Sequence, residues 1–386
     1  MNNLSKRNLP LLVIFIDALS YSVARKIIAD CVGRSEKFGH TNVYRLLPSP
    51  GYSSNLHWLL FAGKTPDEMG FFTDWNIEED AIHFKRNTRI INGLLSKVFD
   101  ENKYLNTLFR YFSRRIGFIK DNIPFSERHL FQPKDYYFFS MPNEDVIDAF
   151  GTKFRVVKGN SSDVHEAFEK ALRSLRGGQH TLVVFNNLDH VGHEKGPDSP
   201  EYLNEAKNYL LGAFEILSSV SWDHVPLIVI SDHGMAKVKF LVNVSEYFYR
   251  EFGLPGAKYA FYCDSVYLRV WSSDSTLLKT VRKDLGSASF LREITLTERQ
   301  EEGLSRRVFG DLIFVLNEGC VFDPNFFSVV LKKFPVGMHG YLDKTDETCG
   351  TLVTNLQLVT KECIDIKVSS VFKLISNKIA EISGGR

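Results

Sequence analysis

PLLVIFID, residues 10–17, is an uninterrupted apolar run that ends in a carboxylate. Apolar and β-branched residues over such a length are typical of a strand buried on both faces, as in a parallel sheet. Two further runs of this kind are HTLVVF at 180–185 and PLIVIS at 226–231. Helical periodicity follows the first run at 20–31 and separates the other two at 200–217. Buried strands that alternate with helices predict an α/β fold with a mainly parallel sheet and helices on both faces.

The rest of the chain adds elements to this core and interrupts it twice. TNVYRLL at 41–47 predicts another strand, and 54–62 predicts a short helix that Gly63 closes. Further strands are expected at 265–271 and 311–316, and one more strand and a final helix in the tail, 349–386. Residues 76–145 and 236–310 break the alternation. We therefore expect one catalytic domain over 1–386, with a largely helical lid at 76–145 and a second insertion at 236–310.

Composition restricts the partners. The chain has 386 residues, 44% of them hydrophobic and 24% charged, and a net charge of +1. No global field favours a nucleic-acid polymer or an anionic membrane, so we expect neither as a partner. The five cysteines form no CxxC pair, and the apolar run near the start is too short for a membrane span or a signal peptide. These features predict a reducing, cytoplasmic setting, and they leave the oligomeric state open.

Polar residues follow the buried strands. Asp17 ends the first run, Asp189 follows the strand at 180–185, and Asp232 and His233 follow the strand at 226–231. In open α/β sheets ligands bind at the carboxyl ends of the strands. We therefore expect these side chains to converge although they are far apart in the sequence.

The residue types indicate a metal centre. Two further histidines join the set, His193 four residues after Asp189 and His339 between two glycines in GMHGY. Three carboxylates and three imidazoles suit zinc, and also manganese or iron. Each piece has a plainer interpretation: a capping aspartate in a turn, a surface helix pair, or a loop histidine. The case for a metal centre rests on the order of the set, because every member follows a predicted strand or lies in a glycine-flanked turn.

Ser53 is the candidate nucleophile, because it comes just before the predicted helix, where backbone N–H groups stabilise an anion. Coordination to a metal would lower the pKa of its hydroxyl. Ser54 is the less favoured alternative, and either serine could simply be the N-cap. Asn55 is within reach of the same site and could donate to a phosphoryl oxygen. Phe71, Phe72 and Trp75 could stack on a base or sugar of a substrate, or belong to the core.

The ordered set resembles the alkaline phosphatase superfamily, and within it the nucleotide pyrophosphatase/phosphodiesterase branch. The matching stretches are LLVIFIDALS, PSPGYSSNLHWLLFAGKTP, LDHVGHEKGPDSPEY, VISDHGM and GMHGY. The resemblance implies a three-layer α/β/α sandwich with inserted lid segments. It also implies that Asp17, Asp232 and His233 hold one metal beside the nucleophile, while Asp189, His193 and His339 hold the other. The reaction would pass through a covalent phospho-enzyme.

The nucleophile segment departs from the branch, which has threonine–x–proline–asparagine where this chain has Ser53-Ser54-Asn55. Counting back from Gly63 selects Ser53, whereas counting from Asn55 would select Tyr52. The cysteine- or serine-x-proline-x-arginine run of sulfatases is absent from the sequence, which counts against sulfatase chemistry.

The expected activity is hydrolysis of a small organic phosphate ester with two divalent ions, Zn²⁺ or alternatively Mn²⁺. A phosphotransferase or mutase of the same superfamily, or an inactive metal-binding relative, stays as an alternative. The substrate and the preference for monoesters or diesters are not determined by the sequence.

Overall fold

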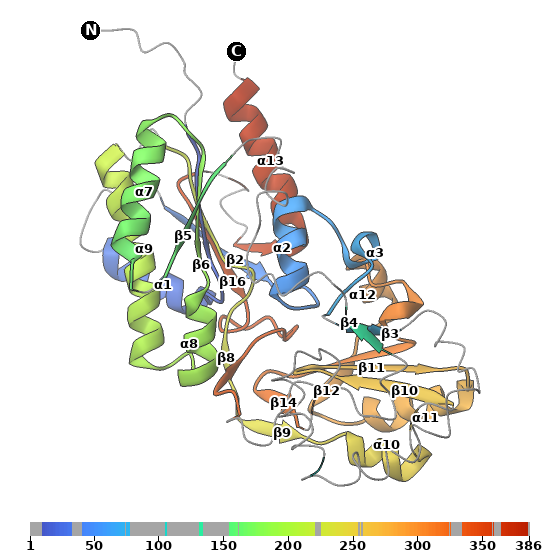
Figure 1. Ribbon diagram of the computed structural model, residues 1–386. Coiled ribbons are helices and arrows are strands. Elements are labelled where there is room, and N and C mark those ends of the chain that lie inside the picture. Colours follow the sequence, from blue (N-terminus) through green and yellow to red (C-terminus); the bar gives the residue numbers. More distant parts are fainter. Residues whose placement is uncertain are drawn as a thin grey trace, which may run out of the picture. The chain divides into compact units, whose positions relative to one another are not determined.

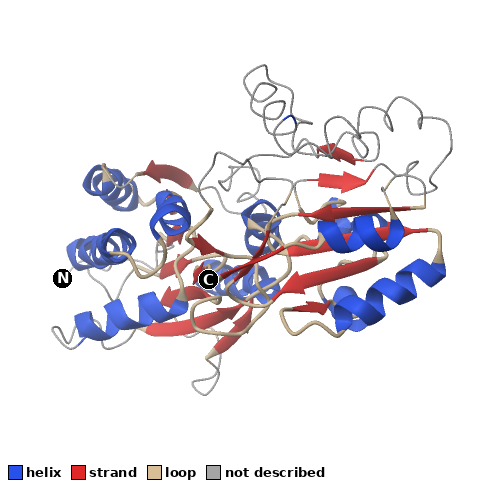
Figure 2. Cartoon of the chain, turned by 90° about the horizontal axis from the view of Figure 1, so that it is seen from below, coloured by secondary structure: helices blue, strands red, loops and turns tan. Residues whose placement is uncertain are grey.

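The computed structural model describes residues 10–32, 41–73, 75–77, 105, 131–133, 154–160, 162–220, 225–253, 255, 258–323, 325, 334–356, 358 and 364–384; Figure 2 draws the others in grey. Most of the lid predicted at 76–145 lies outside these residues. The chain divides into two compact units. The first comprises Met1–Thr65, Phe139–Lys237 and Leu342–Arg386, and the second comprises Pro66–Phe138 and Val238–Tyr341. The predicted division into one domain with two insertions stays a prediction.

The first unit is built on a seven-stranded sheet. Its order is β17 (Asp365–Lys367), β2 (Asn42–Leu47), β16 (Gly350–Thr354), β7 (Leu227–Ile230), β1 (Leu12–Ile16), β6 (Thr181–Phe185) and β5 (Arg155–Gly159). All neighbours are parallel except β16, which runs antiparallel to both β2 and β7. The mainly parallel sheet that the buried runs predicted is confirmed.

Helices cover both faces of this sheet, which makes three layers (Figure 1). Along β1, Leu12, Ile14 and Ile16 face one core, whose helices are α1 (Tyr21–Val32), α7 (Val164–Arg176) and α9 (Pro200–Val220). Val13 and Phe15 face the other core, with α2 (Ser53–Ala62) and α13 (Val368–Gly384). Successive strand residues point to opposite faces, so a strand buried on both sides must be apolar throughout, as β1 is.

The second unit contains a four-stranded antiparallel sheet in the order β10 (Tyr259–Cys263), β11 (Tyr267–Ser272), β13 (Leu312–Leu316) and β12 (Leu291–Glu293). The helices described in this unit are α3 (Pro66–Met69), α10 (Ser245–Phe252), α11 (Ser275–Gly286), α12 (Leu296–Glu301) and the short 3₁₀ helix η7 (Arg307–Phe309). Two-stranded sheets join β3 (Trp75–Ile77) with β4 (Phe131–Pro133) and β9 (Phe240–Val242) with β14 (Cys320–Phe322). The short strand β15 (Gly337–Met338) also belongs to this unit, whereas β8 (Ala236–Lys237) ends a segment of the first unit.

Several elements differ from the sequence prediction. The strand expected at 311–316 is β13, but it pairs antiparallel in the second unit. The tail holds two strands, β16 and β17, rather than one. The edge strand β5 was not predicted, because only part of its sequence, RVVKG, is buried. Within the described residues, no helix combines the length and apolarity that a membrane span requires.

Candidate active site

The carboxyl ends of three adjacent strands carry the candidate ligands. Asp17 follows β1 directly, and its backbone N–H donates to the carbonyl of Phe185, the last residue of β6, at 2.9 Å. Asp232 and His233 come just after β7, which pairs with β1 on the other side. The parallel register thus brings together residues that are about 200 positions apart in the chain. The convergence predicted from the strand ends is confirmed.

Asp17, Asp232 and His233 form one group whose potential ligand atoms all lie within 4.8 Å of one another. Nε2 of His233 is 3.5 Å from Oδ1 of Asp17 and 3.4 Å from Oδ2 of Asp232. The three side chains are buried, with no more than 4% of any exposed. Oδ1 of Asp17 and Oδ2 of Asp232 are buried and accept no hydrogen bond from the described residues. Two buried carboxylate oxygens left in this way fit a bound cation, which would satisfy both.

The tautomer of His233 fits the same role. Its Nδ1 lies 2.9 Å from the carbonyl oxygen of Gly234. A carbonyl only accepts, so Nδ1 carries the ring hydrogen, and Nε2 of the neutral ring offers its lone pair to the group. Metal-bound histidines characteristically have their second nitrogen fixed in this way.

Electrostatic repulsion within the group is strong. Burial, together with the neighbouring charges of Asp232 and Asp189, raises the pKa of the Asp17 carboxyl well above its ordinary value. Burial opposes ionisation of Asp232 too, but the neighbouring imidazoles of His233 and His57 outweigh it and lower the pKa of that carboxyl. Without a cation, two buried carboxylates this close cannot both ionise easily.

The loops that carry the group are tied to each other. The hydroxyl of Ser231 accepts from the backbone N–H of Leu19 at 2.8 Å and donates to the carbonyl of His233 at 2.7 Å. Next to Asp17, Ala18 has a left-handed φ of 63°, and its carbonyl accepts from the hydroxyl of Tyr202. A non-glycine residue holds such a φ only where its surroundings enforce it. These contacts therefore fix the turn after β1, which orients the Asp17 carboxylate toward the other ligands of the group.

Ser53 meets this group from the N-terminus of α2. Its Oγ lies 3.0 Å from Nε2 of His233, and it also interacts with the carboxylates of Asp17 and Asp232. The N-cap of α2 is Tyr52, so neither Ser53 nor Ser54 caps the helix. Ser53 is half-buried, as a nucleophile that must reach a substrate has to be.

Asn55 holds the loop before α2. Its Oδ1 accepts from the N–H of Tyr52 at 2.9 Å, its Nδ2 donates to the carbonyl of Pro50 at 3.0 Å, and the side chain is fully buried. Gly51, with a φ of 125°, leaves room for it, since a Cβ there would lie 1.9 Å from Asn55 Oδ1. The structure thus gives Asn55 a role in shaping the turn before Ser53.

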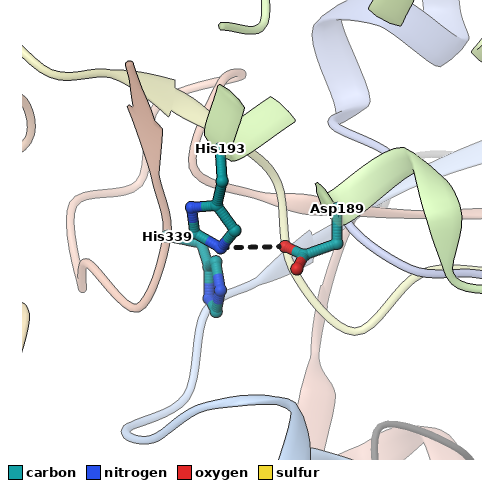
Figure 3. A group of neighbouring side chains, drawn as sticks. All are labelled: Asp189, His193 and His339. Carbon is teal, nitrogen blue, oxygen red and sulfur yellow. Dashed lines mark ion pairs between the residues drawn. The ribbon is translucent and has the colours of Figure 1, made fainter. Parts of the chain in front are cut away.

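The second group of candidate ligands starts on α8 (Asn187–Lys195), which follows β6. Asp189 and His193 are one turn apart, with Oδ1 and Nε2 at 3.4 Å and about a quarter of each side chain exposed (Figure 3). His339, the third candidate ligand of this group, is buried and directly follows β15 in the second unit.

His57 is a neighbour of the first group that the sequence analysis did not single out. It lies on α2 four residues after Ser53, is 3% exposed, and places Nε2 3.5 Å from Oδ2 of Asp232. The spacing of four places it one turn from the nucleophile on the predicted helix, but this spacing alone does not separate a functional histidine from a core residue. Among the proposed substrate contacts, Phe71 is 3% exposed and Phe72 fully buried. Trp75 lies in β3, and its side chain is outside the described residues.

Comparison with known proteins places the chain in a family. Residues 50–342 match the family model for type I phosphodiesterase/nucleotide pyrophosphatase. A search of the curated proteins finds no match.

Solved structures share the fold at low identity. Murine ectonucleotide pyrophosphatase/phosphodiesterase 5 is 14% identical with a TM-score of 0.56, and the match covers 96% of this chain and 95% of that one. An inactive variant of the same murine protein in complex with AMP is 15% identical with a TM-score of 0.54, covering 96% and 94%. Phosphonoacetate hydrolase from Sinorhizobium meliloti 1021, in complex with phosphonoformate, is 14% identical with a TM-score of 0.58, covering 97% and 96%.

The family match includes the nucleophile segment and all the candidate ligands except Asp17, and it extends over about three quarters of the chain. The chain therefore belongs to the type I phosphodiesterase/nucleotide pyrophosphatase family of the alkaline phosphatase superfamily, and it is a phosphoric ester hydrolase.

Proposed function

We propose that the protein hydrolyses a small organic phosphate ester through a phosphoserine intermediate at Ser53, with one divalent ion in each of the two ligand groups. The contact between Ser53 Oγ and His233 Nε2, 3.0 Å long within the buried group of two carboxylates, carries this proposal. It joins a hydroxyl that needs activation to the atoms that would hold a cation.

Ser53 and the N-terminus of α2 have separate roles in the proposed reaction. Ser53 Oγ attacks phosphorus, the Oγ–P bond forms while the bond to the leaving alcohol breaks, and the hydroxyl hydrogen ends on the released alcohol. Water then cleaves the Oγ–P bond and returns the hydroxyl. The first backbone N–H groups of α2 and the positive end of its dipole stabilise the charge on the phosphoryl oxygens.

Asp17, Asp232 and His233 would hold one ion, and Asp189, His193 and His339 the other. When bound, such ions lower the pKa of the nucleophile and neutralise charge on the attacking and leaving oxygens. The mixed nitrogen and oxygen ligands favour Zn²⁺, with Mn²⁺ as the alternative.

We place the substrate among small phosphate or phosphonate compounds. A structural relative is solved with AMP and another with phosphonoformate, and the net charge of +1 favours no polymer. We also propose that the enzyme works in a reducing compartment, because the five cysteines of the sequence form no CxxC pair and an odd number of them cannot all pair within one chain.

A panel of nitrophenyl phosphate monoesters and diesters and a phosphonate tests the proposal. We expect turnover with release of inorganic phosphate or a phosphomonoester, and phosphate on the peptide that contains Ser53 after an acid quench. An isomerised sugar or glycerate phosphate would instead indicate the mutase. Metal binding with no turnover on any of these compounds would indicate an inactive relative.

A further inference from the structure

Oδ2 of Asp232 lies between two imidazoles. Nε2 of His233 is 3.4 Å away and Nε2 of His57 is 3.5 Å away. The other oxygen of the carboxylate, Oδ1, accepts from the backbone N–H of His233 at 3.1 Å. The backbone N–H thus holds Oδ1 of Asp232 in place, whereas the position of Oδ2 depends on the imidazoles beside it.

His233 cannot supply a hydrogen to Oδ2 in its neutral form. Its ring hydrogen is on Nδ1, which donates to Gly234, so its Nε2 presents a lone pair. Nε2 of His57 is the other ring nitrogen near Oδ2 in the described part of the group, and it can carry a hydrogen that points at this oxygen. Both nitrogens of His57 are buried, and neither makes a hydrogen bond with the described residues.

The environment of His57 holds its ring in this orientation. The ring packs at 88° to that of Phe15, with centroids 4.9 Å apart, and Phe15 lies on the buried inner strand β1. Because an unsatisfied buried imidazole is costly, core packing alone would favour an apolar residue at this position.

We propose that His57 is a positioning residue, whose Nε2–H orients the Asp232 carboxylate for the cation beside Ser53. The inference rests on the proposed function. It gives α2 two roles, since the helix presents the nucleophile from its first residue and supports a metal ligand from its second turn. Partners that orient ligating carboxylates and histidines typically change metal affinity by about 10- to 100-fold when they are removed.

Three substitutions separate hydrogen bonding from packing. His57→Phe and His57→Leu remove the donor and keep an apolar side chain against Phe15. His57→Gln keeps an N–H at the same number of bonds from the backbone. Phe61→Leu is the matched control, because Phe61 packs on the same Phe15 ring at 5.7 Å from the next turn of α2. It disturbs the packing and leaves the His57–Asp232 contact in place.

The measurement is a competitive Zn²⁺ titration of the metal-free proteins against a chromophoric chelator, with thermal unfolding and ester turnover recorded in parallel. We expect His57→Phe and His57→Leu to bind the ion at the Ser53 site about 10- to 100-fold more weakly. His57→Gln should stay close to the wild type. Phe61→Leu should lower the unfolding temperature without a change in zinc affinity.

Wild-type zinc affinity in both apolar variants would overturn the inference, as would equal weakening in His57→Gln and His57→Leu. If His57→Phe does not fold, the comparison of zinc affinity between His57→Leu and His57→Gln shows whether the N–H at position 57 matters. These results leave the proposed function intact, provided that the wild type binds zinc and turns over esters. A wild type that does neither overturns both.

Discussion

Ser53 combines three properties that a serine nucleophile needs. Its hydroxyl lies 3.0 Å from a histidine nitrogen that presents a lone pair, it interacts with two buried carboxylates, and it is the first residue of a helix. A free serine hydroxyl is a poor nucleophile at neutral pH, so its reactivity depends on this surrounding. Ser54 is the next residue of the same helix and serves as a natural comparison.

Ser53→Ala should abolish ester turnover while the protein still folds and binds metal. We expect a loss on the order of 10³-fold or more, because the covalent step has no other hydroxyl at this position. Steady-state kinetics and elemental analysis of the same preparation would check this. Ser54→Ala should keep most of the activity, and the reverse pattern would move the nucleophile to Ser54.

The strand ends explain why so much of the site is predictable from the sequence. A strand that is apolar on both faces has no structural need for a carboxylate directly after it, so Asp17 and Asp232 stand out. His57 does not stand out, because a histidine among leucines and aromatics on a helix is indistinguishable from a core residue. The role of His57 depends on how α2 packs against β1 and beside the end of β7, and no local sequence pattern contains this information. The antiparallel partners of β13 escaped prediction for the same reason, since they are distant in the chain.

The end of α2 depends on Gly63. This residue has a left-handed φ of 64°, and a Cβ there would lie 2.5 Å from Cδ1 of Phe372 on α13. Gly63→Ala should therefore destabilise the first unit by more than the roughly 1 kcal/mol that a left-handed alanine alone costs. Thermal unfolding measures the difference. Gly178→Ala is the control, because its φ is 76° and nothing lies within 4 Å of the added Cβ. Equal effects of the two substitutions would show that the contact with Phe372 is unimportant.

The hydrogen bond between the residues that precede β1 and β6 should be sensitive to acid. Nδ1 of His180 accepts from the backbone N–H of Leu11 at 2.9 Å, and burial lowers the pKa of the ring below its ordinary 6.5. A lowered pKa means that protonation favours the unfolded chain. The stabilisation is complete above pH 6.5 and is lost as the pH falls from there through the folded-state pKa.

His180→Asn keeps an acceptor near the Nδ1 position and cannot titrate. Denaturant unfolding between pH 7.5 and 5 should show a smaller loss of stability for this variant than for the wild type. His165→Asn, which changes an exposed histidine on α7, should keep the wild-type slope. If the slope of His180→Asn equals that of the wild type, another group controls the acid response.

For the molecule as a whole, folding alone does not satisfy the first ligand group. Oδ1 of Asp17 and Oδ2 of Asp232 are buried without hydrogen bonds from the described residues, and burial, together with the charge of Asp232, raises the pKa of Asp17. Ions that bind only the folded state should therefore stabilise it by mass action, by about 4 kcal/mol at a thousandfold excess over the dissociation constant. Removal of the ions by a chelator should lower the unfolding temperature and stop turnover together, and addition of Zn²⁺ should restore both.

Elemental analysis of the untagged protein, paired with Asp232→Asn and Asp189→Asn, tests the two-metal centre most directly. We predict about two zinc ions per chain in the wild type and the loss of about one ion in each variant, from a different group in each case. Wild-type protein without any bound divalent metal, or with a metal content that neither substitution changes, would contradict the account.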